Sequence, residues 1–176
     1  MQSKAEVTRL LKEAAHGSNQ AYNDIFPLVY NELRGIAHRI RFKFRGEETL
    51  NTTAIVHEAY IKLVRSEKDW ENRNHFYCIA GKAMRQILLN AARSKKMQKR
   101  DAAIIPISAE DIDYKINLSV KASEELIKLE EALITLQEKD EGHIRIVECR
   151  FFAGMSIDET ADALGVSPAT IKRKWQ

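Results

Sequence analysis

Residues 156–176 have the sequence SIDETADALGVSPATIKRKWQ, which predicts two short helices joined by a tight turn. Ser156 and Glu159 have the spacing of a capping box, in which each side chain accepts a hydrogen bond from the other residue's backbone amide. Gly165 supplies the conformational freedom that a tight turn requires. Ser167 and Pro168 then suit the N-cap and the first position of a second helix. Helix, glycine turn and helix at this spacing indicate a helix-turn-helix unit.

The second helix of such a unit enters the DNA major groove. The predicted DNA contacts on it are Ser167, Thr170, Lys172, Arg173 and Lys174. Ala161 is small where the two helices must approach closely. A small core between them is expected from Ile157, Leu164, Val166, Ile171 and Trp175. The alternative is an ordinary helical hairpin with a solvated basic end.

The rest of the chain also repeats apolar residues at i, i+3, i+4 and i+7, the spacing of helices, and has no convincing period-2 run. We therefore predict an all-α protein. Pro27 either kinks one helix or begins a new one, and Thr52 or Thr53 is the expected N-cap of a third helix. The pattern breaks at 97–121. We expect two small helical domains, 1–97 and 123–176, joined by a linker at 98–122.

The 176 residues carry a net charge of only +3, but the charge is unevenly distributed. From 72 to 100 there are eight basic residues and no acidic one, whereas 108–141 holds ten acids against four lysines. A basic block of this kind predicts a polyanion-binding face.

Aromatic residues border the basic block, and rings beside cations are what single-stranded DNA binding requires, because bases stack on rings and phosphates pair with cations. Two residues have packing alternatives: Phe76 lies on the apolar stripe and is expected in the core, and Trp70 suits packing and stacking equally. The predicted contacts in this segment are Trp70, Arg73, His75, Tyr77, Lys82, Arg85, Arg93, Lys95 and Lys96.

Catalytic and metal-binding motifs are missing from the sequence. His57 and Glu58 begin like a zinc-protease helix, but position 61 is Ile, and no glycine-rich phosphate loop occurs. We expect no enzyme activity, no metal and no cofactor. Cys78 and Cys149 stand 71 positions apart without a Cys-x-x-Cys pair, so two reduced thiols are expected. Without a secretion signal or a membrane-spanning apolar run, the protein is expected to be cytoplasmic.

Three segments in this order resemble the extracytoplasmic-function (ECF) sigma factors of the sigma-70 family. TAIVHEAYIKL at 53–63 is similar to the second helix of sigma region 2, and WENRNHF at 70–76 with AMRQIL at 83–88 is similar to its promoter-melting part. The segment from FFAGMS at 151–156 through TIKR at 170–173 is similar to sigma region 4. The resemblance covers about 19–176.

The resemblance implies a dissociable RNA polymerase subunit that directs the enzyme to promoters for transcription initiation. The docking helix for the β′ clamp helices would present Val56, His57, Glu58 and Tyr60. The segment 70–100 would read and open the −10 element, and region 4 would read the −35 element and touch the β flap. An anti-sigma factor is a further candidate partner. Two departures are Lys82, where many members have Asn, and the chain end at Gln176, which suggests a truncated recognition helix.

Two other classes of function are alternatives. The first is a self-sufficient helix-turn-helix transcriptional regulator with an N-terminal sensor or dimerisation domain, which would have no need of the basic block at 72–100. The second is an enzyme acting on nucleic acid, which the missing catalytic cluster disfavours.

Overall fold

The computed structural model describes residues 4–15, 19–43, 51–66, 70–100, 116 and 118–176. No strand occurs among them, so the all-α prediction is confirmed. The helices are α1 (Lys4–Ala15), α2 (Asn19–Lys43), α3 (Thr52–Arg65), α4 (Arg73–Arg100), α5 (Val120–Lys139), α6 (Glu141–Val147), the π-helical turn η1 (Glu148–Phe152), α7 (Ile157–Leu164) and α8 (Pro168–Trp175).

Two helix details settle points that the sequence left open or misassigned. Pro27 lies inside α2, which continues through it as one helix. The N-cap of α3 is Asn51, whose side chain accepts hydrogen bonds from the amides of Thr53 and Ala54, so the prediction of Thr52 or Thr53 was wrong. Asn is as good a cap as Ser or Thr because its side-chain oxygen reaches the same orphan amides.

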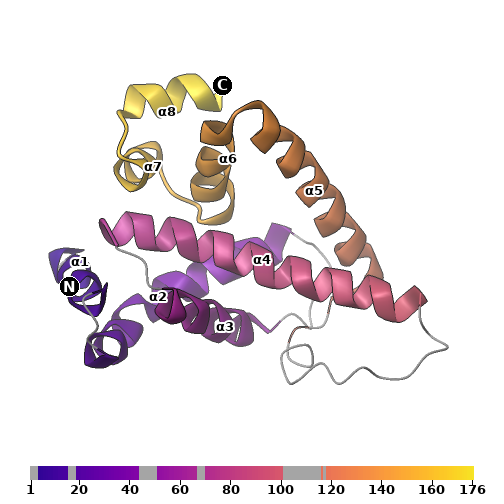
Figure 1. The fold of residues 1–176 in the computed structure, drawn as a ribbon, viewed down its shortest axis with the longest axis horizontal. Helices are drawn as coiled ribbons and strands as arrows, with labels where there is room; N and C mark the ends of the chain where they lie inside the picture. The colour runs from indigo at the N-terminus through magenta and orange to yellow at the C-terminus, as the bar shows by residue number, and fades with distance from the viewer. Residues whose placement is uncertain (1–3, 16–18, 44–50, 67–69, 101–115, 117) are drawn as a thin grey trace.

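The long helix α4 is the centre of the molecule (Figure 1). The helices α2 and α3 pack on one side of it, and η1 and α7 pack on the other. α5 packs against α4 as well and leads back to α6. α4 therefore contacts both the N-terminal and the C-terminal parts of the chain.

The main core is one continuous cluster of buried side chains that draws on both parts of the chain. Phe76, Met84 and Leu88 contribute from α4, and Phe152 contributes from η1; all four are at most 1% exposed. A second, smaller cluster lies between α6, α7 and α8. The division into domains at 1–97 and 123–176 stays a prediction. The ends of the predicted linker are helical, because α4 runs to Arg100 and α5 begins at Val120, while 101–115 and 117 lie outside the described residues.

The two cysteines contradict the expectation of reduced thiols. Cys78 on α4 and Cys149 on η1 form a disulfide, with their Cα atoms 4.7 Å apart. That separation lies within the range that a disulfide can bridge. The packing of η1 against α4 creates the proximity, and a sequence separation of 71 gives no sign of it.

None of the helices in the described ranges is long and apolar enough to cross a membrane.

Candidate nucleic-acid and polymerase interfaces

The predicted helix-turn-helix is formed by α7 and α8. The capping box is present: the Ser156 amide donates to Glu159 Oε2 at 2.9 Å, and the Glu159 amide donates to Ser156 Oγ at 3.1 Å. Gly165 adopts the left-handed conformation, with φ 64°, that ends α7. Ser167 caps α8 by accepting from the Thr170 amide, and Pro168 occupies the first turn. The local chemistry of this motif matches the sequence prediction.

The core of the motif is smaller than expected. Ile171 is fully buried and packs with Ala161 and Ile146, while Ile157 and Leu164 border them. Val166 and Trp175 were predicted there, but both are more than 40% exposed. Ile146 on α6 takes up the remaining space, because α8 packs on α6 as well as on α7. The Trp175 ring instead lies 5.0 Å from the guanidinium carbon of Arg150.

The basic residues of α8 differ in their surroundings. Lys172 and Arg173 are exposed, whereas Ile171 faces the core. Lys174 instead forms an ion pair with Asp140, at 3.0 Å from Oδ2. This hydrogen bond is the main cause that lowers the pKa of Asp140 to about 2. Ser167 and Thr170 share a hydrogen bond between their hydroxyls at 3.0 Å.

Trp70, a predicted stacking platform, is buried. Its side chain is 2% exposed, and its ring packs edge-on against Phe76 at 5.1 Å and beside His75 at 6.1 Å. A ring in this position has no face for a base, so the structure favours the packing alternative for Trp70. Phe76 is in the core, as expected.

Tyr77 and Arg73 also turn towards the protein. Tyr77 is 6% exposed, and the Arg73 guanidinium carbon lies 5.4 Å from its ring. Burial raises the pKa of the Tyr77 hydroxyl well above its ordinary value, with a smaller contribution from Glu32. Tyr77 therefore does not present a free ring for stacking in this arrangement.

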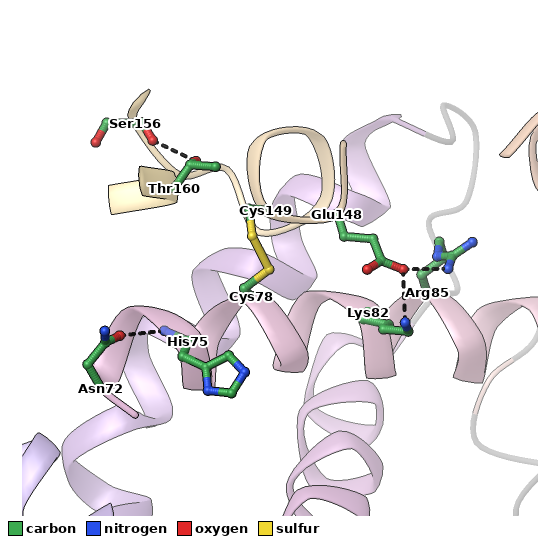
Figure 2. Close-up of a disulfide and its surroundings, with 9 residues drawn as sticks. All are labelled: Asn72, His75, Cys78, Lys82, Arg85, Glu148, Cys149, Ser156 and Thr160. Carbon is green, nitrogen blue, oxygen red and sulfur yellow. Dashed lines mark hydrogen bonds and ion pairs between the residues drawn. A yellow bond between two sulfur atoms is a disulfide. The ribbon is translucent and has the colours of Figure 1, made fainter. Parts of the chain in front are cut away.

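Arg85 was predicted to contact DNA but is held in a buried ion-pair cluster. Its two terminal nitrogens donate to Glu130 on α5 and to Glu148 on η1, the latter at 2.9 Å. Lys82 lies 3.4 Å from Glu148 as well, but its side chain is 54% exposed (Figure 2). Glu148 is buried and Glu130 is only partly exposed, so both carboxylates need a cation, and Arg85 is occupied by them.

The other predicted DNA contacts on α4 are exposed or partly exposed. Arg93 and Lys96 are exposed, and Lys95 and His75 are partly exposed. Together with Lys82, Arg93 and Lys96 leave a basic surface along α4 that is narrower than the sequence predicted.

The predicted docking residues of α3 lie on different faces. Val56 is fully buried, so it presents no surface to a partner in this arrangement. Tyr60 is half-buried and donates its hydroxyl to the Tyr22 carbonyl. His57 is exposed, and its ring also contacts Phe26 at 5.7 Å; Glu58 is partly exposed.

The sequence reasoning missed Ile61, which is 42% exposed on α3. It follows His57 by four residues, so the two lie on one face of the helix. That spacing could have identified it as part of the docking surface.

Comparison with known families matches residues 4–176 to the family described as ECF sigma factor. The chain belongs to the ECF sigma factor family. The match spans both the α3–α4 segment and the helix-turn-helix, and these are the regions in which the resemblance was seen. A search of curated proteins and a search of solved structures found no match.

Membership of the ECF sigma factor family defines the general role of this protein. ECF sigma factors are regulatory, DNA-binding proteins that act in transcription initiation with RNA polymerase and promoter DNA. Within the described residues, no three His, Cys, Asp or Glu side chains gather as a metal ion would require.

Proposed function

We propose that this sigma factor works in the cytoplasm, without enzymatic chemistry, and brings RNA polymerase to promoters through three surfaces. α3 binds the β′ clamp helices, α8 reads the −35 element while its domain touches the β flap, and α4 holds the opened −10 strand. The observation that carries the proposal is the capped helix α8, which is anchored by buried Ile171 and presents exposed Lys172 and Arg173.

The proposal for α8 follows from which of its side chains have internal partners. Lys172 and Arg173 are exposed, so both are available for base edges or phosphates. Lys174 is paired with Asp140 and would have to exchange that carboxylate for a phosphate. We therefore assign reading to Lys172 and Arg173 and a secondary, positioning contact to Lys174.

The proposal for α4 rests on charge rather than on aromatic stacking. Lys82, Arg93 and Lys96 are exposed cations on a helix that contains no acidic residue. Such a surface attracts phosphates of either strand, and the attraction weakens steeply with salt. Arg85, Tyr77 and Trp70 do not belong to this surface in the observed arrangement.

The α3 surface combines His57, Glu58 and the exposed apolar side chain of Ile61. Co-purification with core RNA polymerase tests it directly. Glu58→Lys should weaken the complex while leaving helical content unchanged, and the matched charge reversal Glu138→Lys, at an exposed position of α5, should not weaken it. Equal recovery of both variants with the core enzyme would remove Glu58 from the interface.

A second experiment measures promoter binding by the holoenzyme across a range of salt concentrations. Lys172→Ala and Arg173→Ala should each cost about 1–3 kcal/mol if the lost contact reads a base. If it touches a phosphate, they should instead lower the salt slope by about 1. Lys128→Ala on α5 is the control, because Lys128 is an exposed lysine outside the motif. Unchanged affinity and slope for the α8 variants would exclude this helix from the groove. Tight, specific DNA binding without core polymerase would favour the self-sufficient regulator.

A further inference from the structure

The disulfide joins the two parts of the chain that the proposed function assigns to different promoter elements. Cys78 lies in the second turn of α4, and Cys149 lies in η1, just before the helix-turn-helix. Figure 2 shows the bond bridging the two segments. Both cysteines are at most 4% exposed, so the bond lies inside the contact between them.

Other contacts around the disulfide hold the same two segments together. Glu148, adjacent to Cys149, binds Arg85 and Lys82 of α4 (Figure 2). α4 also approaches the backbone closely at Gly81, where an added Cβ would lie 3.0 Å from the Ala153 nitrogen. The contact is therefore closely packed on both sides of the sulfur atoms.

The start of α4 contacts the helix-turn-helix itself. Asn74 donates to Asp162 Oδ2 at 2.8 Å, and Asn72 donates to the Asp162 carbonyl at 3.2 Å. Asp162 belongs to α7, the first helix of the DNA-binding motif. In this arrangement one proposed DNA-binding part covers the beginning of the other.

This closed arrangement cannot bind both promoter elements at once. The −35 and −10 elements are about 25 base pairs apart, roughly 85 Å along B-DNA. α4, the longest helix in the described residues, spans only about 42 Å at 1.5 Å per residue, and the disulfide ties η1 to its second turn. The two parts must separate before each can reach its own element, and an intact disulfide forbids that separation.

The redox state of the cytoplasm favours a regulatory role for this disulfide. A sigma factor works beside RNA polymerase, where thiol systems keep most cysteines reduced, and disulfides formed there are usually transient and redox-sensing. A disulfide at this contact is therefore suited to switching rather than to permanent stabilisation.

A route to the bond exists on the α4 side. Cys78 lines a cavity of about 530 Å³ together with His75 and Lys82, which lie three residues before it and four after it on the same face of α4. The exposed side chain of Lys82 places the cavity at the surface. The species that attacks a disulfide is a thiolate, and this cavity gives it access to Cys78.

We infer that the Cys78–Cys149 disulfide is a redox latch, which holds the helix-turn-helix against α4 until a dithiol reductant opens it. The inference rests on the proposed two-element promoter binding. A reductant thiolate attacks Cys78 Sγ, forms a mixed disulfide and releases Cys149 as a thiolate, which takes a proton from water. The second reductant thiol then displaces Cys78, so two electrons pass to the protein and the reductant becomes the disulfide. Oxidants that accept two electrons from the two thiols, such as a diamide, reverse the step.

The first test measures shape and does not depend on function. Small-angle scattering of the full chain, oxidised with diamide, should give a radius of gyration of about 16 Å, the value for a compact chain of this length. Reduction with dithiothreitol should increase it, and Cys149→Ala should match the reduced protein under both conditions. Circular dichroism confirms that each sample is folded. Equal radii for oxidised and reduced wild type would overturn the latch.

The second test measures DNA binding by holoenzyme. Holoenzyme assembled from core polymerase and the Cys149→Ala variant first selects duplexes from a random-sequence library. Binding of the selected duplexes by wild-type holoenzyme is then measured. Oxidised wild-type holoenzyme should bind these duplexes at least about tenfold more weakly than reduced wild-type holoenzyme, a usual size for coupling between sites. Adding dithiothreitol should restore binding. Equal affinity before and after reduction would overturn the latch. If Cys149→Ala holoenzyme selects no duplex, the proposed function fails, and the scattering result still decides whether the disulfide closes the molecule.

Discussion

Replacing Trp70 by alanine should destabilise the protein by about 3–5 kcal/mol, the usual cost of removing a large buried aromatic ring. The side chain is 2% exposed. Burying an aromatic ring removes on the order of 200 Å² from water, worth about 5 kcal/mol at roughly 25 cal/mol per Å². Alanine recovers part of this through its own methyl group and through relaxation of the cavity. The edge-on contact with Phe76 is lost as well.

Two matched variants separate packing from other effects of losing a tryptophan. Trp70→Phe keeps a ring against Phe76 and removes an indole N–H that has no hydrogen-bond partner among the described residues, so it should cost about 1 kcal/mol or less. Trp175→Ala removes a ring that is 42% exposed over Arg150 and should also cost about 1 kcal/mol or less.

Urea unfolding followed by far-UV circular dichroism, with every sample fully oxidised, measures the three free energies of unfolding. The competing role for Trp70 is base stacking, which permanganate reactivity of unpaired thymines detects in a holoenzyme. If Trp70→Ala changes stability by less than about 1 kcal/mol and abolishes that reactivity, the ring leaves the core to hold DNA, and the packing argument is wrong.

Gly81→Ala should lower the free energy of unfolding by about 1 kcal/mol, because its Cβ would lie 3.0 Å from the backbone nitrogen of Ala153. Gly35→Ala, whose nearest new neighbour is 3.6 Å away, should raise it by about 0.5–1 kcal/mol, and urea unfolding that ranks the two the other way would contradict the tight contact. The hydrogen bond from Lys174 lowers the pKa of Asp140 to about 2 from its ordinary 3.8. The stabilisation by the Asp140 carboxylate is therefore complete above about pH 4 and lost as the pH falls towards 2. Asp140→Asn keeps the helix cap but removes the charge. The variant should therefore melt at a lower temperature than wild type above pH 4, and the difference should shrink as the pH falls towards 2. A difference that does not change with pH would exclude the carboxylate charge as its cause.

The helix-turn-helix shows how much local sequence can determine. The capping box of Ser156 and Glu159, the left-handed Gly165 and the Ser167 cap each depend on atoms within about four residues. The sequence of this segment is therefore sufficient to predict its local structure. In α3 the same local reasoning failed, because Asn51 was overlooked beside two threonines that could also cap the helix.

Exposure was harder to predict than helix position. Periodicity placed Ile171 in the core and Lys172 and Arg173 outside it, as observed. The same reasoning left Trp70 undecided and placed Arg85 on the DNA-binding surface. Trp70 follows residues that the helical pattern does not cover, and Arg85 is buried only because α5 and η1 lie over α4.

The sequence by itself determined the all-helical class, the helix-turn-helix and the family to which the chain belongs, because helices and their caps depend on neighbours along the chain. Only the tertiary structure decided that the helix-turn-helix rests on α4, that Cys78 bonds to Cys149 and that Arg85 neutralises Glu148. These partners are more than 60 positions apart. Contact between such distant residues depends on how whole helix faces pack and on the entropy of closing the chain between them. Neither can be predicted from the residues around either partner.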